Sequence, residues 1–266
     1  MFGTYFYHER IRKAVASFGA LFNDIYVLRK NSSGHTVSTQ KVPLSYGPRV
    51  KFLDRIREQA NLTTDTKVAI KLPRMAFEIV NISYDPSRQL PKVNNFNKAI
   101  EGTILNRNKV FAGVPYIISF QLSIFAKQQD DALQVVEQII PFFNPQYNLT
   151  IKPFKLYSDI KQDVPVTLTG VVLADDYEGP MEASRRTIQY TLDFDMQVYF
   201  HGPFSSQGII RKIDARIFDA NKGLGIGTDS DVPLERITTT PTPVGVGPDS
   251  DFGFSTSIIE IDSAGG

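Results

Sequence analysis

Cysteine and tryptophan are both absent from the 266 residues of the chain. Without cysteine, disulfide bonds, zinc–thiolate sites and thiol nucleophiles are excluded. The sequence also lacks any apolar run approaching the roughly 18–20 residues of a membrane-spanning helix. The N-terminus turns charged at His8-Glu9-Arg10 without the basic start and apolar stretch of a signal peptide. We therefore expect the protein to stay on the side of the membrane on which it is made.

An excess of charge of one sign is missing as well. The 29 lysines and arginines are balanced by 28 acidic residues, which leaves a formal net charge of +1. Dedicated nucleic-acid binders usually carry a basic excess, so this balance argues against one. A nearly neutral chain also meets little global repulsion when copies associate. The 42% of hydrophobic residues is enough for a sizeable core, in one large domain or two small ones.

The first part of the chain predicts two helices and a hairpin. Apolar residues recur at three- and four-residue steps over residues 7–23, which is typical of an amphipathic helix. Strands are expected at 25–29 and 36–44, on either side of a turn at 31–34. A short second helix is expected over 48–59, because proline is favourable at the first position of a helix.

The middle of the chain carries the clearest strand patterns. Apolar and polar residues alternate over 116–126 and again over 186–200, which predicts two long strands with one buried face each. Residues 66–84, 164–174 and 208–218 predict further strands, the first of them interrupted at a proline. The pattern as a whole favours an α+β fold with a largely antiparallel, or mixed, β-sheet on which the helices pack.

A third helix is expected between the strand at 116–126 and Pro141, which ends it. Asp130 or Asp131 is expected to cap its N-terminus. Its apolar side chains are expected to pack on Phe120, Leu122 and Ile124 of the preceding strand. The residues predicted to point inward are Leu133, Val136, Ile139 and Ile140.

Two segments depart from ordinary domain composition. Residues 85–112 are polar and rich in Asn, Pro, Lys and Arg, and we expect them to form a long excursion. Residues 221–250 are rich in Gly, Pro, Thr and Asp, so they are expected to be extended and largely without regular structure. Apolar residues return over 252–261, which predicts docking on a sheet edge of the same or a neighbouring subunit. The predicted organisation is a domain over 1–220 and an extended C-terminal tail over 221–266.

No catalytic, cofactor-binding or metal-binding residues are expected. The histidines, His8, His35 and His201, are far apart and have no second ligand at metal-binding spacing. Asp193 and Asp195 share one face of a strand, and paired carboxylates can perform acid–base chemistry. A hydrolase using this pair is the alternative hypothesis, and it requires a pocket that encloses both acids. A solvent-facing or intersubunit strand face is favoured, because no lysine, histidine or third acid is supplied nearby, and we expect that the protein is not an enzyme.

Several segments, spread in order over residues 1–220, resemble those of one family. They are Met1-Phe2-Gly3, Tyr5-Phe6-Tyr7, Leu122-Ser123-Ile124-Phe125, Asp130-Asp131, Val136 to Pro145, Ser184-Arg185-Arg186, and Gly208 to Arg211 leading to Phe218. The family is that of the tail sheath stabiliser and completion proteins, or tail terminators, of T4-like contractile-tailed bacteriophages. Beyond residue 221 no match is evident.

The resemblance implies a structural virion protein that forms a homohexameric ring, caps the contractile tail, stabilises the sheath and joins the tail to the neck and head. The implied partners are further copies of the chain, the tail sheath protein, the tail tube terminator and the neck or head-completion proteins. DNA passes through such an assembly without sequence-specific binding, and neither a membrane nor a cofactor is implied. The implied location is the tail–neck junction of the virion, after assembly in the host cytoplasm. An oligomeric adaptor outside phage is a third hypothesis.

Partner contacts are expected at two places. One is the pair of arginines before the strand at 186–200, where an acidic partner would bind. The other is the apolar end of the C-terminal tail. The predicted contact residues are Arg185, Arg186, Phe252, Phe254, Ile258 and Ile259.

Overall fold

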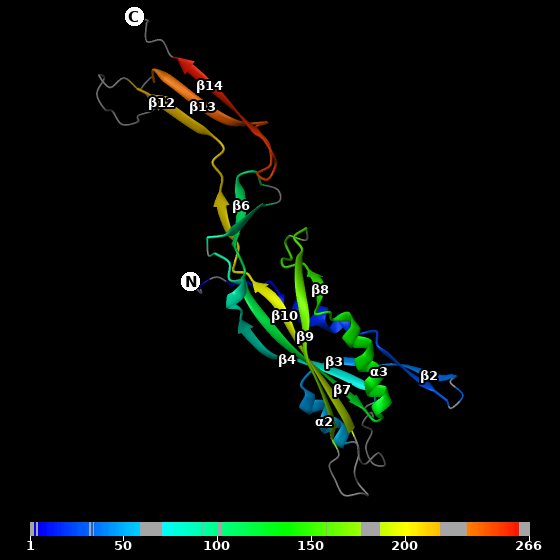
Figure 1. The fold of residues 1–266 in the computed structure, drawn as a ribbon. Coiled ribbons are helices and arrows are strands. Elements are labelled where there is room, and N and C mark those ends of the chain that lie inside the picture. The colour runs from blue at the N-terminus through cyan, green and yellow to red at the C-terminus, as the bar shows by residue number, and fades with distance from the viewer. Residues whose placement is uncertain are drawn as a thin grey trace, which may run out of the picture. The chain divides into compact units, whose positions relative to one another are not determined.

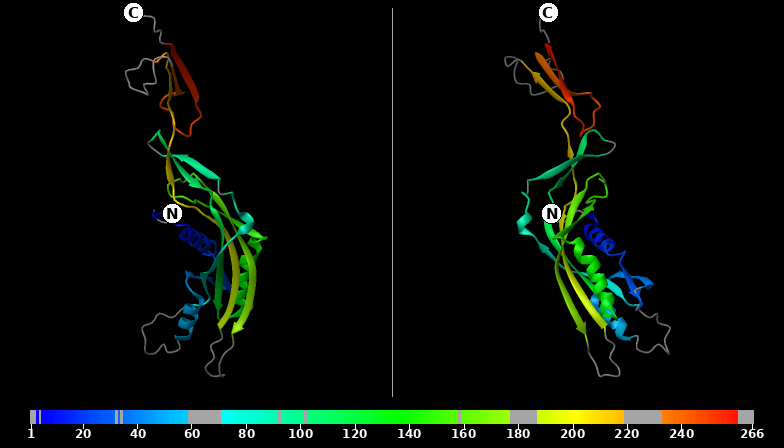
Figure 2. Two further views of the ribbon diagram at one scale, coloured as in Figure 1. Left: turned by 90° about the vertical axis from the view of Figure 1, so that its left-hand side faces the viewer. Right: turned by 45° about the vertical axis from the view of Figure 1, so that its right-hand side comes forward.

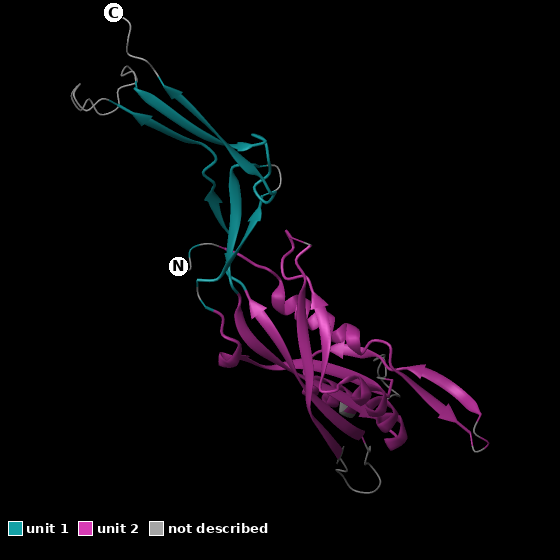
Figure 3. Cartoon of the chain, turned by 45° about the horizontal axis from the view of Figure 1, so that its top comes forward, with its two compact units in different colours: residues 1–4, 91–112, 201–266 teal, residues 5–90, 113–200 magenta. Residues whose placement is uncertain are grey.

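The computed structural model describes residues 3, 5–31, 33, 35–58, 71–91, 93–100, 103–157, 159–176, 187–218 and 233–260 (Figure 1). The chain divides into two units (Figure 3). The larger unit contains residues 5–90 and 113–200, and the smaller unit contains residues 1–4, 91–112 and 201–266. The smaller unit combines residues 91–112 with residues after 200, because strands from these two parts of the chain pair with each other.

The larger unit is built on a six-stranded sheet in the order β3-β4-β7-β10-β9-β8 (Figure 1). Neighbouring strands are antiparallel, except that β3 runs parallel to β4. The fold is therefore mostly β, with several antiparallel sheets and few helices, which confirms the α+β class in broad outline. The strands are β3 (Leu44–Tyr46), β4 (Arg74–Tyr84), β7 (Val114–Ala126), β8 (Gln146–Ile151), β9 (Gln162–Asp176) and β10 (Thr187–Phe200).

The facing of the apolar residues on the two long alternating strands is confirmed. The expectation of a single buried face is wrong at one end of the pair, because Ser123, Phe125, Gln189 and Thr191 on the other face are buried as well. On β7, Phe120, Leu122 and Ile124 are buried, and on β10 every second residue from Ile188 to Val198 is buried. The two strands pair antiparallel along their whole length, so these side chains form one continuous apolar face. This face forms the sheet side of the main hydrophobic core.

Helices cover both faces of the central sheet (Figures 1 and 2). α1 (Arg10–Leu21) and α3 (Gln129–Ile139) share the main core with the face that carries Leu122. α2 (Arg49–Glu58) packs through Phe52 on the opposite face, against Ala76 and Phe125. Two short 3-10 helices complete the unit, η1 (Pro86–Arg88) and η2 (Ile140–Phe142).

α1 begins with a buried arginine. The Arg10 side chain is 8% exposed and donates hydrogen bonds to the Tyr199 carbonyl oxygen and to the Gln162 side chain. Burial lowers the pKa of Arg10 to about 10. The charged residue therefore ties the start of α1 to β9 and β10, a role that no spacing in the sequence indicates.

The predicted orientation of α3 is wrong for two of its residues. Leu133 and Ile140 are exposed, whereas Ala132, Val135, Val136 and Ile139 are buried. The cap is also different, because Gln128 occupies the N-cap and makes no capping hydrogen bond through its side chain. Asp131 explains the difference: it is 1% exposed and accepts a hydrogen bond from Arg29, which turns the Asp131 side of the helix inward.

The predicted strand at 36–44 is divided in two. β2 (Thr36–Lys41) pairs with β1 (Tyr26–Lys30) in a separate two-stranded sheet, while β3 joins the central sheet. Pro43 separates β2 from β3 and has no N–H to donate, so the ladder does not continue through it.

The smaller unit consists of two antiparallel three-stranded sheets in the orders β11-β6-β5 and β12-β13-β14. The predicted strand at 208–218 is divided between these sheets, because Gly208 ends β11 in the first sheet and residues 213–217 form β12 in the second. The region expected as a long excursion contains β5 and β6, whose hairpin lies in the first sheet. The strands are β5 (Asn95–Ala99), β6 (Asn106–Phe111), β11 (Ser205–Gly208), β12 (Ile213–Ile217), β13 (Glu235–Thr242) and β14 (Gly253–Glu260).

The prediction that residues 221–250 lack regular structure is wrong for β13. This strand lies between β12 and β14 and forms hydrogen-bonded ladders with both. Ile237 and the threonines that follow it are β-branched, which suits a strand paired on both sides. The composition of 221–250 indicated an irregular segment because glycines and prolines surround this short β-branched run.

Candidate interaction surface

Most of the large apolar side chains described in the smaller unit are exposed, although Val110 is buried. Among the described residues, both clusters of buried apolar side chains lie wholly within the larger unit. A region that exposes this much apolar surface is typical of a protein interaction site. The exposed apolar residues of the smaller unit are Val93, Phe96, Ile104, Leu105, Phe111, Ile210, Ile213, Ile217, Phe218, Leu234, Val244, Phe254, Ile258 and Ile259.

Strand β14 is a fully exposed part of this surface. All eight of its residues are exposed, including Phe254 (67%), Ile258 (59%) and Ile259 (53%). One edge of β14 pairs with β13, and no backbone hydrogen bond joins the other edge to any described residue. An exposed apolar edge strand is a template for pairing with another chain.

The structure describes four of the six predicted contact residues. Phe254, Ile258 and Ile259 lie together on β14, and Phe252, which is half-buried, contacts the Phe254 ring edge-to-face at 5.4 Å. Arg185 and Arg186 lie outside the described residues. The predicted strand addition is present within the chain, as β14 on β13, but it leaves the apolar side chains exposed, so their role in partner contact stays a prediction.

Polar contacts, and not an apolar core, link the two sheets of the smaller unit. Asp249 accepts a hydrogen bond from the Ala99 amide at 2.7 Å and pairs with Arg107 at 3.3 Å. Arg211 donates to the carbonyl oxygens of Ile104 and Val246, at 2.8 and 2.6 Å. These contacts hold the turn before β14 against the first sheet and so help to place β14.

A cross-strand ion pair that the sequence did not indicate joins β12 to β13. Arg236 donates from Nε to Asp214 Oδ1 at 3.0 Å and also pairs with Oδ2 through its second guanidinium nitrogen. These hydrogen bonds, together with the charges of Arg236, Arg216 and Lys212, lower the pKa of Asp214 to about 2. The two residues are 22 positions apart, and only the strand register brings them together.

The ion pair predicts a pH dependence for the pairing of β12 with β13. An unfolded aspartate titrates near about pH 3.9, above the folded value. The stabilisation is therefore complete above the unfolded pKa and is lost as the pH falls toward about 2. NMR shifts of the β12 and β13 amides, followed from about pH 5 downward, should report this loss. Asp214→Asn should remove the dependence, and a folded-state titration of Asp214 near the unfolded value would contradict it.

The carboxylates of the alternative hydrolase hypothesis have structural partners. Asp193 lies opposite Gln121 across the β10–β7 pair and accepts its hydrogen bond at 2.9 Å. Asp195 lies opposite Ser119 and accepts a hydrogen bond from its hydroxyl at 2.7 Å. Within the described part of the chain, no group of three histidine or acidic side chains is placed to hold a metal ion. The pair therefore forms part of a cross-strand polar ladder.

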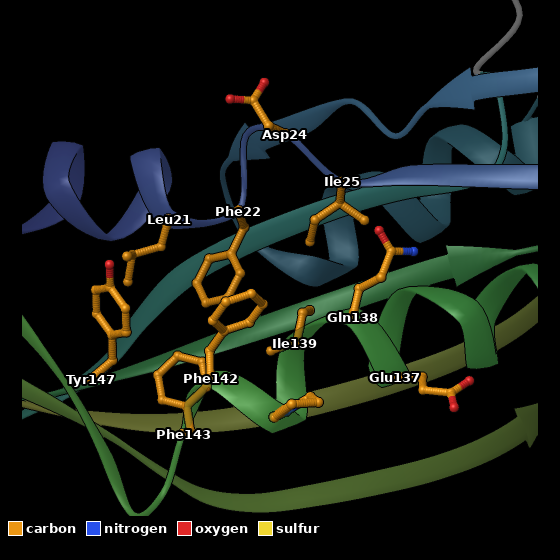
Figure 4. Close-up of a pocket in the computed structure, with 11 residues that line it drawn as sticks. Leu21, Phe22, Asp24, Ile25, Glu137, Gln138, Ile139, Phe142, Phe143 and Tyr147 are labelled. Atoms are coloured by element: carbon orange, nitrogen blue, oxygen red, sulfur yellow. The ribbon is translucent and has the colours of Figure 1, made fainter.

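The larger unit contains an apolar pocket of about 580 Å³ at the C-terminal ends of α1 and α3. Figure 4 shows the rings of Phe22, Phe142 and Phe143 gathered together, while Asp24 and Glu137 extend away from them. Neither carboxylate of the hydrolase hypothesis lines this pocket. Its lining provides apolar surface and no nucleophile paired with a base.

None of the helices in the described ranges is long and apolar enough to span a membrane. The comparison with known proteins then decides the family. The T4-like virus Myoviridae tail sheath stabiliser family matches residues 5–262. The chain belongs to this family. It is also similar to the "Tail completion protein gp15" of Enterobacteria phage T4, with 28% identity over 226 residues that cover 79% of the chain and 77% of that protein.

Membership in the tail sheath stabiliser family makes the protein a structural component of the phage tail, as the resemblance implied. The expected end of the resemblance at about residue 220 is wrong, because the family match continues to residue 262. The match therefore includes β13 and β14. The sequence alone showed no match here because β13 and β14 are surrounded by Gly- and Pro-rich residues.

Proposed function

We propose that the protein assembles into a closed homohexameric ring that caps the contractile tail, stabilises its sheath and joins it to the neck. The observation that carries the proposal is the smaller unit, whose strands expose their apolar side chains and an unpaired edge. Such surface becomes favourable only when a partner covers it. A head-to-tail contact closes into a ring when the rotation between copies fits.

The proposed partners, besides copies of the chain, are the tail sheath protein, the tail tube terminator and the neck or head-completion proteins. DNA would pass through the ring without sequence-specific contacts, which suits a chain with a net charge of +1. The ring would act at the tail–neck junction of the virion, following assembly in the host cytoplasm. We assign partner contacts to Phe252, Phe254, Ile258 and Ile259 and to the arginines Arg185 and Arg186.

A catalytic role is not part of the proposal. Asp193 and Asp195 are each held by a cross-strand hydrogen bond, and neither lines the apolar pocket. A general acid–base pair needs groups aimed at a space that a substrate can occupy. Membership in a family of structural tail proteins also disfavours the non-phage adaptor.

Ring formation is expected to depend on the apolar residues of β14. Replacing Phe254 and Ile258 together with aspartate should weaken ring assembly roughly tenfold or more, because charged groups would be buried at the contact. Imaging of tails and native mass spectrometry should show six copies for the wild type and loss of rings for the variant. Folding of the variant should be unchanged, since both side chains are exposed.

Val80→Asp provides the matched control, because Val80 is 61% exposed but lies on β4 of the larger unit. It should leave the rings intact. A stable two-fold dimer in the tail, or full ring assembly by the Phe254→Asp and Ile258→Asp double variant, would contradict the proposed function.

A further inference from the structure

The β1–β2 hairpin has one protected edge. Two glutamines of α3, four residues apart, cover the outer edge of β1 with paired hydrogen bonds. Gln134 accepts from the Leu28 amide at 3.0 Å and donates to the Leu28 carbonyl at 3.1 Å. Gln138 does the same for Tyr26, at 3.5 and 2.8 Å. The side-chain amides therefore occupy the places that a further strand would take.

The other edge of the hairpin, that of β2, is open. Tyr26 and Leu28 direct their backbone groups away from β2, so their opposite residues, Lys41 and Thr39, direct theirs outward as well. No backbone hydrogen bond joins these outward groups to any residue in the described ranges. This two-stranded sheet can therefore grow on the β2 side and not on the β1 side.

The hairpin and the C-terminal strand carry opposite charge. Arg29, Lys30 and Lys41 are the charged residues of β1 and β2, and neither strand contains an acid. Arg29 and Lys41 already pair with Asp131 and Asp24, so Lys30 carries the net positive charge of the hairpin. The stretch from Asp251 through Glu260 contains both of these acids and no lysine or arginine. Both segments also expose apolar side chains, for example Leu28 on the hairpin and Ile258 on β14. Two open edges with opposite charge and matching apolar surface are complementary.

We propose that β14 of one copy adds to β2 of a second copy of the chain. The sheet β12-β13-β14 of one subunit then continues into the hairpin of its neighbour as a five-stranded sheet. The inference rests on the proposed ring, whose head-to-tail contacts would repeat this pairing at every interface. Main-chain hydrogen bonds supply the link, and Lys30 on the hairpin favours the acidic strand.

Disulfide cross-linking tests the pairing, because the native chain has no cysteine to interfere. Thr39→Cys is made in one preparation, and Thr256→Cys, Ile258→Cys or Glu260→Cys in another, so that three registers are sampled on one face of β14. Tails assembled from an equal mixture are then oxidised. At least one β14 position should cross-link to residue 39 as a dimer of the two variants, since a disulfide needs Cα atoms within about 7 Å.

Matched variants define the outcomes. Val80→Cys replaces an exposed residue of a strand other than β2, and it should not cross-link to any β14 position. Combining Thr39→Cys with the reactive β14 cysteine in one chain should give a ladder of oligomers up to the closed ring. Cross-linking of β14 only to β14, an exclusively intramolecular bond in the doubly substituted chain, or capture of a different tail protein by Thr39→Cys would each overturn the proposal.

A backbone variant gives a second test. Thr39→Pro removes an outward-facing N–H and leaves the hydrogen bonds to β1 in place, because edge strands tolerate proline at such positions. Assembly should weaken roughly tenfold relative to Thr39→Val, which keeps the donor. Rings that form normally in the wild type, with no link from residue 39 to any of the three β14 positions and no effect of Thr39→Pro, would defeat the β2–β14 pairing alone. The absence of rings from wild-type tails would defeat the proposed function itself.

Discussion

Replacing Phe18 with alanine is expected to lower the free energy of unfolding by roughly 3–5 kcal/mol. The Phe18 side chain is fully buried on the inner face of α1. Its ring stacks on Phe120 at 4.3 Å and lies 5.3 Å from the rings of Phe77 and Phe194. The three contacted phenylalanines come from three different strands. Truncation would leave a cavity between a helix and a sheet, and neither element can collapse freely to fill it.

Denaturant unfolding followed by far-UV circular dichroism measures this loss, since the described helices all lie in the larger unit. Phe142→Ala removes the same ring from a site that is 67% exposed, so its effect should stay within about 1 kcal/mol. Equal effects of the two substitutions would show that Phe18 is not at the centre of the core.

Replacing Arg29 with alanine is expected to cost about 2–3 kcal/mol. Asp131 is 1% exposed and receives hydrogen bonds from Arg29 at 2.6 and 3.4 Å. The same hydrogen bonds and the charge of Asp131 raise the pKa of Arg29. Arg29 itself is 44% exposed, so solvent screens the attraction of the pair. Most of the loss therefore arises because the variant leaves a buried carboxylate without its cation.

A double-mutant cycle separates these contributions. Arg29→Ala combined with Asp131→Ala should be less destabilising than the sum of the single changes, because no buried charge is left unpaired. Lys41→Ala is the matched control: its partner Asp24 is 77% exposed, and the loss should be below about 1 kcal/mol. Losses that add without coupling would refute the role given to Asp131.

The two long strands and their facing were determined by the sequence alone. The alternation of apolar and polar residues over 116–126 and 186–200 predicts which side of a sheet each side chain occupies, because successive residues of a strand point to opposite faces. The first helix is a similar case, since its apolar spacing locates the stripe that carries Phe18. The absence of cysteine likewise needed no structure.

The open and closed edges of the sheets were decided by the tertiary structure. Strand β13 forms because β12 and β14 pair with it on both sides, although its Gly- and Pro-rich surroundings indicated a tail. The same pairing brings Arg236 to Asp214, and the docking of α3 brings Gln134 and Gln138 to the edge of β1. A sequence pattern records which face of a segment is apolar. It does not record which distant segment pairs with it, because the main-chain hydrogen bonds that join two strands are the same for nearly every residue type.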